Sequence, residues 1–199
     1  MEDKENEIIK ILKNDGIGIM PTDTLYGLVG SAFSRKAINR IYKIKNRDKK
    51  KKMIVLISSI KDLEKFGISN RLIRANRRML EKVWSGKVSV ILNNIAFRLP
   101  AKKSLVEILK KTGPLVAPSA NPEGLKPAEN IKQAKEYFGP VRSRSPKGDR
   151  NTRMLAREAS NGIGNNVDFY LSGGTLKSKP STLIKINKKG EIEVLRGNI

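Results

Sequence analysis

The sequence predicts a single α/β domain, built on a twisted, open, mixed sheet with flanking helices. Helix-like and strand-like segments interleave along the chain without strict alternation, which favours a mixed sheet over a purely parallel one. The length of 199 residues suits one domain, and an apolar share of 38% is enough for a core. The chain also shows no internal repeat.

The first half of the chain begins with a helix and a strand. An apolar stripe at 8–12 predicts a helix that stops at the Asn-Asp-Gly of 14–16, and a buried strand follows at 17–20. Ser34 is a candidate N-cap for a second helix, whose apolar face extends to Ile44. The remaining elements predicted before residue 100 are a strand at 53–57, one basic helix at 70–83, and strands at 88–92 and 95–99.

The second half continues the mixture of helices and strands. Gly139 is the expected C-cap of a helix at 130–138. The other predicted elements are a helix at 104–111 and strands at 115–117, 167–171, 182–186 and 192–195. The last two strands would form a hairpin around the Asn-Lys-Lys-Gly of 187–190.

Residues 140–164 differ in composition from the rest of the chain. They hold five Arg and one Lys against two acidic residues, a charge of 6 − 2 = +4, whereas the rest has nine Arg and 26 Lys. The stretch is long for a loop in a compact domain. A basic flap over the site, a disordered insertion and a sequence foreign to the domain are all compatible with it. We expect a solvated basic insertion at 140–164 in one domain that spans 1–199.

Charge and missing residue types restrict the function. The chain has 41 Lys plus Arg against 19 Asp plus Glu, a net charge of +22, which indicates polyanionic partners or simply a soluble basic surface. It has no Cys and no His, which excludes disulfides, thiolate nucleophiles, Ser-His-Asp triads and His or Cys metal sites. An acidic N-terminus and short apolar runs predict neither a signal peptide nor a membrane span, so we expect a cytoplasmic location.

Four short constellations could carry chemistry. Residues 21–30 follow a buried strand and offer hydroxyls and backbone N–H groups, at a position where α/β proteins place ligands. Residues 45–52 hold six positive charges beside a predicted helix end, and 117–124 place Ser and Asn on a turn framed by prolines. The C-terminal pair is 180–182 and 195–197. Each segment alone is also typical of an ordinary turn or a solvated charge run.

Taken in order, these segments resemble the YrdC family, the threonylcarbamoyl-AMP synthases of the TsaC type. Residues 21–28 match the family's P-T-(E/D)-T-x-Y-G-L motif, 45–47 its K-x-R and 119–121 its S-x-N. Residues 84–92 and 97–100 resemble the family's W-P-G-P-x-T and R-x-P segments. The resemblance spans 8–138 and resumes at 167–197, so it covers most of the chain.

The resemblance implies a YrdC-like twisted sheet with a concave, positive face, and it implies a reaction. L-Threonine, bicarbonate and ATP would give threonylcarbamoyl-AMP and pyrophosphate, for the threonylcarbamoyladenosine modification of tRNA. A nucleotidyltransferase of this kind needs positioning and charge stabilisation but no protein nucleophile, so a chain without His or Cys can do it. Mg²⁺ would accompany the ATP phosphates, and a partner transferase complex is also implied.

The resemblance further implies roles for individual residues. The catalytic residues would be Lys45 and Arg47, as stabilisers of phosphate charge. The ATP-binding residues would be Arg47, Lys51, Ser119, Asn121 and Arg196. The threonine-binding residues would be Thr24, Arg98, Ser181 and Thr182, with no residue assigned to a metal. Two alternatives stay open: an RNA-binding module of the same fold (for tRNA or rRNA) without this catalysis, and a family member that acts on another carbamoyl or acyl substrate.

Overall fold

The computed structural model describes residues 2–139, 167–186 and 191–198. Its strands are β1 (Ile17–Pro21), β2 (Tyr26–Ser31), β3 (Ile54–Leu56), β4 (Val88–Leu92), β5 (Ile95–Arg98), β6 (Leu115–Val116), β7 (Phe169–Tyr170), β8 (Thr182–Ile186) and β9 (Ile192–Arg196). Its helices are α1 (Glu2–Lys13), α2 (Arg35–Ile44), the 3-10 helix η1 (Ile60–Phe66), α3 (Asn70–Ala75), α4 (Arg77–Val83), α5 (Lys103–Thr112) and α6 (Ile131–Phe138). The expected insertion at 140–164 lies outside the described residues.

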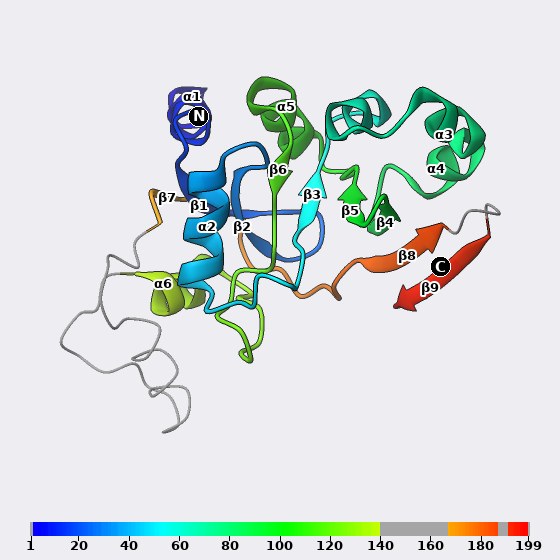
Figure 1. Ribbon diagram of the computed structural model, residues 1–199. Coiled ribbons are helices and arrows are strands. Elements are labelled where there is room, and N and C mark those ends of the chain that lie inside the picture. Colours follow the sequence, from blue (N-terminus) through cyan, green and yellow to red (C-terminus); the bar gives the residue numbers. More distant parts are fainter. Residues whose placement is uncertain (1, 140–166, 187–190, 199) are drawn as a thin grey trace.

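The described strands form one open sheet in the order β7-β1-β2-β6-β3-β5-β4-β8-β9 (Figure 1). Antiparallel pairs join β1 to β2, β4 to β5 and β8 to β9, while β1–β7, β3–β5 and β4–β8 are parallel. The predicted mixed α/β fold is therefore confirmed. The β8–β9 hairpin is also confirmed, although its turn at 187–190 lies outside the described residues.

Helices cover the two faces of the sheet unequally. On one face, side chains from α2, η1, α3, α4 and α6 pack against strand residues along most of the sheet, including Ile19, Val55, Phe97 and Ile184. On the other face, α1 and α5 pack together over residues of β1, β2, β3 and β6, such as Met20 and Leu56. Successive side chains of a strand point to opposite faces, so Val55 and Leu56 enter different cores. No helix of the described residues lies over the part of the second face that β5, β4 and β8 form (Figure 1).

Local signals set the ends of two helices as predicted. The Ser34 hydroxyl accepts a hydrogen bond from the Ala37 N–H at 3.0 Å and caps α2. Asn130 caps α6 in the same way, through the Gln133 N–H at 2.9 Å, and the Gly139 N–H closes that helix on the Lys135 carbonyl. The predicted caps at Ser34 and Gly139 are confirmed.

The segment at 21–30 combines a short turn with a second strand. Only 22–25 form the turn, in which the Thr22 hydroxyl donates to the Leu25 carbonyl at 2.7 Å. The chain then forms β2, which pairs antiparallel with β1 and is almost wholly buried. Gly30 lies inside β2 and gives α2 room, because a Cβ at Gly30 would lie 3.1 Å from the Ala37 Cβ.

The predicted basic helix at 70–83 is two helices. The backbone leaves helical geometry at Asn76, which is 9% exposed and whose side chain donates to the Leu72 carbonyl at 2.9 Å. Such a bond between a side chain and the preceding turn competes with the regular helix. The 3-10 helix η1 is not predicted by the sequence pattern. Among the described residues, no helix combines the length and the hydropathy needed to cross a membrane.

Candidate active site

A cavity of about 620 Å³ lies over the part of the sheet that α1 and α5 leave uncovered. This size is typical of small-molecule sites. Its floor is made by alternate residues of the three strands, whose neighbours enter the opposite core. The floor residues are Ile91 in β4, Ala96 and Arg98 in β5, and Leu183 and Lys185 in β8.

One end of the cavity is built around Arg98, which is 4% exposed. Its Nη1 donates to Thr24 Oγ1 at 3.1 Å, and its Nη2 forms an ion pair with Asp23 Oδ1 at 3.1 Å. Burial lowers the pKa of Arg98 from its ordinary value; Asp23 opposes this and the Arg196 charge adds to it. Within the described residues, the buried Arg98 Nε has no hydrogen-bond partner. The site therefore holds an unused cationic donor.

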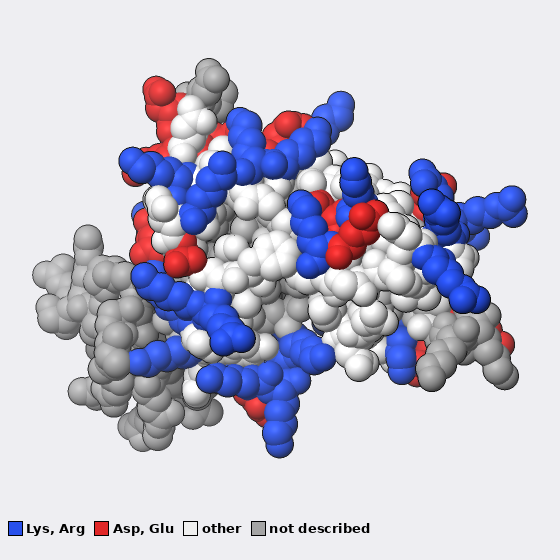
Figure 2. Space-filling view, turned by 45° about the horizontal axis from the view of Figure 1, so that its top comes forward, with Lys and Arg blue, Asp and Glu red and all other residues white. Residues whose placement is uncertain are grey.

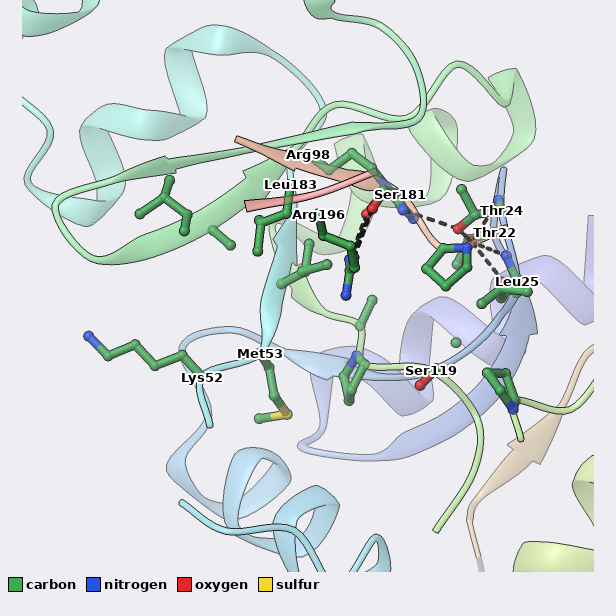
Figure 3. Close-up of a pocket in the computed structure, with 18 of the residues that line it drawn as sticks. Thr22, Thr24, Leu25, Lys52, Met53, Arg98, Ser119, Ser181, Leu183 and Arg196 are labelled. Carbon is green, nitrogen blue, oxygen red and sulfur yellow. Dashed lines mark hydrogen bonds between the residues drawn. The ribbon is translucent and has the colours of Figure 1, made fainter. Parts of the chain in front are cut away.

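A second guanidinium, Arg196 in β9, lies close to Arg98. Its Nε and Nη2 both donate to the Ser181 carbonyl, at 3.1 and 3.0 Å, and the Ser181 hydroxyl lies 2.9 Å from that of Ser89. Figure 3 shows Arg98, Arg196 and Ser181 together, with the Arg196 side chain extending into the cavity. Two like charges in one partly buried place favour an anion between them.

The turn at 22–25 provides two hydroxyls next to Arg98. The Thr22 and Thr24 hydroxyl oxygens are 3.1 Å apart, and the Thr24 N–H donates to the Thr22 hydroxyl at 3.1 Å. Both residues are 4% exposed and line the cavity. The tight turn between β1 and β2 therefore fixes two polar side chains at this end.

The other end of the cavity is basic and more open. Arg47 follows the end of α2, and its Nε and Nη2 donate to the carbonyls of Lys51 and Lys52 at 2.9 and 3.2 Å. Figure 3 shows Lys52 on the opposite side of the cavity from Thr22 and Thr24. Among the described residues, the cavity is lined by six cationic side chains and by no acidic one: Arg47, Lys50, Lys52, Arg98, Lys185 and Arg196. The cavity therefore suits an anionic ligand.

The Ser-Ala-Asn loop at 119–121 contributes to the wall from a third direction. The Ser119 hydroxyl lines the cavity and donates to Asn121 Oδ1 at 2.6 Å. The Asn121 amide donates to the carbonyls of Pro122 and Leu125 at 2.9 and 2.6 Å, so it holds the loop rather than the cavity.

Lys45 lies behind this loop, only 2% exposed. Its ammonium nitrogen donates to the carbonyls of Ser119, at 2.5 Å, and Asn121. Burial lowers the pKa of Lys45 from 10.5 to about 7; the nearby Arg47 charge adds to this and Glu123 opposes it. Lys45 supports the wall of the cavity but does not form part of it.

The structure gathers some of the predicted site residues and leaves others outside the wall. Those that line the cavity are Thr24, Arg47, Arg98, Ser119, Ser181 and Arg196. Those that do not are Lys45, Lys51, Asn121 and Thr182. Lys51 forms an ion pair with Glu123, and the Thr182 hydroxyl donates to the Asn198 carbonyl at 2.7 Å. The polar atoms of these four side chains already form hydrogen bonds or ion pairs with other groups of the protein.

Sequence reasoning missed several residues of the site. Asp23 and Thr22 lie inside the recognised motif but had no role, and Lys50 and Lys52 lie inside the recognised charge run. The alternation of side chains along β5 could have placed Arg98 on the cavity face, but it could not have predicted that Arg98 pairs with Asp23. Ser89 had no sequence signal, because its role depends on the parallel pairing that places β8 beside β4.

Comparison with protein families and curated proteins gives a consistent result. The family model for Sua5, YciO and YrdC, described as "Telomere recombination", matches residues 10–144. A Methanocaldococcus jannaschii protein named "Putative threonylcarbamoyl-AMP synthase" is 25% identical over 215 residues, which cover 100% of this chain and 89% of the relative. The threonylcarbamoyl-AMP synthase of Psychromonas ingrahamii is 28% identical over 148 residues, 67% of this chain and 78% of the relative.

Solved structures share the fold. P. abyssi Sua5 complexed with L-threonine superposes with a TM-score of 0.76 at 20% identity, over 98% of this chain and 54% of Sua5. E. coli YciO gives a TM-score of 0.73 at 18% identity, over 98% of this chain and 89% of YciO. This chain therefore spans about half the length of Sua5 but most of the length of YciO.

Proposed function

The chain belongs to the Sua5/YciO/YrdC family, and we propose that it makes threonylcarbamoyl-AMP and pyrophosphate from L-threonine, bicarbonate and ATP. The names of the curated relatives support an enzyme of this activity. The observation that carries the proposal is the cavity itself, with a closed end around Arg98, Thr24 and Ser181 and an open basic end around Arg47. The closed end suits an amino acid, and the open basic end suits the phosphates of a nucleoside triphosphate.

L-Threonine would occupy the closed end. Its carboxylate would accept from the Arg98 Nε, the buried donor that has no partner within the described residues. Its side-chain hydroxyl would exchange hydrogen bonds with Thr22, Thr24 or Ser181. Asp23 holds Arg98 in place, and its negative charge offsets part of the free-energy cost of burying that guanidinium.

ATP would occupy the rest of the cavity. Its triphosphate would lie against Arg47, Lys50 and Lys52, with Arg196 and Ser119 nearer the α-phosphate. Lys45, Lys51 and Asn121 would act indirectly, because their polar atoms already bind protein groups. The base would lie on the apolar part of the wall, which Met53, Ile91 and Leu183 supply.

Magnesium would enter with the triphosphate. Among the described residues, no three His, Cys, Asp or Glu side chains lie together in a way that could hold a metal ion. A protein cage for Mg²⁺ does not fit these residues, so we assign the metal to the substrate and derive no step through it.

The reaction needs two bond-forming steps. The neutral amine of threonine attacks CO₂ derived from bicarbonate and loses one proton, which gives a carbamate. A carbamate oxygen then attacks the α-phosphorus of ATP, and the bond to the β-phosphate oxygen breaks to release pyrophosphate. Charge that develops on the phosphates would be stabilised by Arg47 and Arg196, fixed in advance by hydrogen bonds to carbonyls.

The wider setting of the reaction is part of the same proposal. The product would serve the threonylcarbamoyladenosine modification of tRNA through a partner transferase, and we expect this to take place in the cytoplasm, where tRNA and ATP are available. We also propose one domain over 1–199, with the basic segment at 140–164 as an insertion.

The test is a pyrophosphate-release assay. Purified protein with ATP, bicarbonate and L-threonine should release pyrophosphate and form threonylcarbamoyl-AMP, detectable by mass spectrometry. Omitting threonine or bicarbonate should stop release, and Arg47→Gln should reduce it. Release that does not depend on threonine would contradict the proposal, and dependence on a different amino acid would favour another carbamoyl acceptor.

A further inference from the structure

A strap of chain, residues 172–180, leads from β7 at one edge of the described sheet to β8 near the other edge, as the orange trace in Figure 1 shows. All of 171–181 is described, and it forms neither helix nor strand. The strap nevertheless ends at the cavity, where Pro180 and Ser181 line the wall. Contacts outside regular secondary structure must therefore fix the position at which Ser181 enters the cavity.

The side chain of Tyr26 fixes the start of this strap. Its hydroxyl accepts a hydrogen bond from the Gly173 N–H at 2.8 Å and donates one to the Gly174 carbonyl at 2.7 Å. Both roles of the phenol hydroxyl, donor and acceptor, are thus used by adjacent residues of the strap. Tyr26 is 0% exposed and belongs to the apolar core, so close packing around its ring holds the hydroxyl at one position.

Two glycines allow this close approach. Gly174 has φ = +76°, in the left-handed region that favours glycine. A Cβ at Gly173 would lie 2.5 Å from Pro21 Cγ, closer than two such carbon atoms can approach. Further along the strap, the Leu176 N–H donates to the Glu129 carbonyl at 2.7 Å. A few specific contacts therefore place the strap, and the loss of one of them should shift it.

The far end of the strap positions two residues of the proposed site. The Ser181 carbonyl accepts from both Nε and Nη2 of Arg196, and the buried Ser181 hydroxyl lies 2.9 Å from that of Ser89. A displaced strap would move the Ser181 hydroxyl within the amino-acid end of the cavity. It would also change the carbonyl that holds Arg196.

The backbone of Tyr26 joins a second part of the cavity wall. Its carbonyl accepts from the Ala120 N–H at 2.8 Å, inside the loop at 119–121. Tyr26 also directly follows the turn at 22–25, which carries the two threonine hydroxyls. One buried residue therefore connects three segments of the wall, and its hydroxyl is responsible for the connection to the strap.

We propose that Tyr26 is a positioning residue for the amino-acid substrate, because its hydroxyl fixes, through the strap, where Ser181 lies in the cavity. This inference rests on the proposed function, which places L-threonine beside Ser181. Tyr26 acts through other residues, since both hydrogen bonds of its hydroxyl are made to the protein. Its loss should weaken the binding of threonine more than that of ATP, whose phosphates are assigned to the open basic end.

The first experiment measures pyrophosphate release by the full chain while threonine or ATP is varied. Tyr26→Phe removes the hydroxyl and keeps the buried ring, and it should raise the KM for L-threonine about fivefold, as expected for hydrogen bonds of ordinary strength. The KM for ATP should change less than about twofold. An equal rise in both values would overturn the proposal. So would a lower kcat with both KM values unchanged, which is the result of losing folded enzyme.

Tyr137→Phe is the matched control. The Tyr137 hydroxyl accepts from Gln133 Nε2 at 3.1 Å within α6, and neither residue lines the cavity. The control thus removes one tyrosine hydroxyl and one of its hydrogen bonds at a place remote from the strap. Both KM values should stay at those of the wild type.

Amide hydrogen exchange of the protein without substrates tests the strap independently of the reaction. Figure 2 shows Lys and Arg side chains over much of the visible surface, so trypsin would cut at many places and exchange is the more selective probe. In Tyr26→Phe, the amides of 172–176 should exchange about tenfold faster, while those of β1 and β2 keep the wild-type rates. Faster exchange throughout β1 and β2 would show a general loss of stability and overturn the proposal.

A second variant displaces the same part of the strap without touching Tyr26. Gly174→Ala strains the backbone, because alanine disfavours a φ of +76°. If the Tyr26 hydroxyl acts through the strap, the rise in threonine KM in Tyr26→Phe/Gly174→Ala should be smaller than the product of the two single effects. Two effects that simply multiply would overturn the proposal.

The outcomes distinguish this inference from the proposed function. A wild type that releases no threonine-dependent pyrophosphate rejects the proposed function, and the substrate role of Tyr26 with it. A wild type that does release it, with Tyr26→Phe indistinguishable from Tyr137→Phe, keeps the proposed function and overturns this inference alone. The melting temperature of each variant verifies that the fold is intact.

Discussion

The ammonium group of Lys45 lies under the backbone of Ser119, with 2.5 Å between Lys45 Nζ and the Ser119 carbonyl oxygen. The same nitrogen donates to the Asn121 carbonyl, and the Glu123 N–H donates back to the Lys45 carbonyl at 2.8 Å. The end of α2 and the 119–123 loop are thus joined by three bonds across more than 70 positions of sequence. One wall of the cavity is fixed by a residue that does not reach the cavity.

Replacing Lys45 should cost stability. Lys45→Met keeps the length and removes the donor, so two carbonyls near the buried end of α2 lose their partner. We expect a loss of about 1–3 kcal/mol in the free energy of unfolding, measured by urea denaturation. Lys43→Met, an exposed position on the same helix, is the control and should change stability by less than about 0.5 kcal/mol. Equal effects would mean that the two bonds contribute nothing.

The same residue predicts a pH dependence of stability. Burial holds the pKa of Lys45 near 7 in the folded protein, whereas the ordinary value of 10.5 applies to the unfolded chain. Between these values the unfolded chain holds a proton that the folded protein has released, so stability rises with pH. The difference in unfolding free energy between wild type and Lys45→Met should therefore shift in favour of wild type from pH 7 to pH 10. A constant difference would place the pKa of Lys45 outside this range.

Arg47 and Lys51 should differ, although the family resemblance implies an ATP contact for both. Arg47 lines the cavity and is held by two carbonyls, while Lys51 is paired with Glu123 outside the wall. We expect Arg47→Gln to reduce pyrophosphate release about 10²-fold, since it removes a preorganised phosphate donor. Lys51→Gln should reduce it less than about tenfold. Comparable losses would show that Lys51 leaves Glu123 when ATP binds.

Two threonines offer a matched pair for the amino-acid end of the cavity. The Thr24 hydroxyl accepts from Arg98 inside the cavity, but the Thr182 hydroxyl donates to the Asn198 carbonyl outside it. Thr24→Val should raise the Kd for L-threonine about tenfold and leave the Kd for ATP unchanged, because one hydrogen bond to a charged group is lost. Thr182→Val should change the threonine Kd by less than about twofold, as calorimetry can measure.

Much of the fold could be predicted because its signals are local. Ser34 caps α2 through its own side chain, and the alternation of apolar residues identifies β4, β5 and β8 without knowledge of their neighbours. The break at Asn76 could not be predicted, because the apolar spacing continues across it. The close approach of α2 to Gly30 is likewise a tertiary contact, whose partner local sequence signals do not reveal.

The residues of the site likewise divide into those that sequence motifs locate and those whose position depends on tertiary contacts. Thr24, Arg98 and Arg196 could be located from motif order, because each comes from a segment with its own sequence pattern. The burial of Lys45 could not be predicted, because Lys45 begins a run of cations that is typical of a solvated surface. Only the return of the chain at 119–121 buries it. The pairing of Asp23 with Arg98 likewise depends on two hairpins that meet in space.

The alternation of the β5, β4 and β8 side chains has a consequence for engineering. Residues that determine what the cavity accepts, such as Ala96, Leu183 and Lys185, alternate with residues that hold the sheet together, such as Phe97 and Ile184. A library randomised at every second position of these strands would therefore sample new ligand specificities while each member retains the apolar layer that lets it fold. In these three strands, the side chains that face the cavity can therefore vary, while the side chains that face the core maintain the fold.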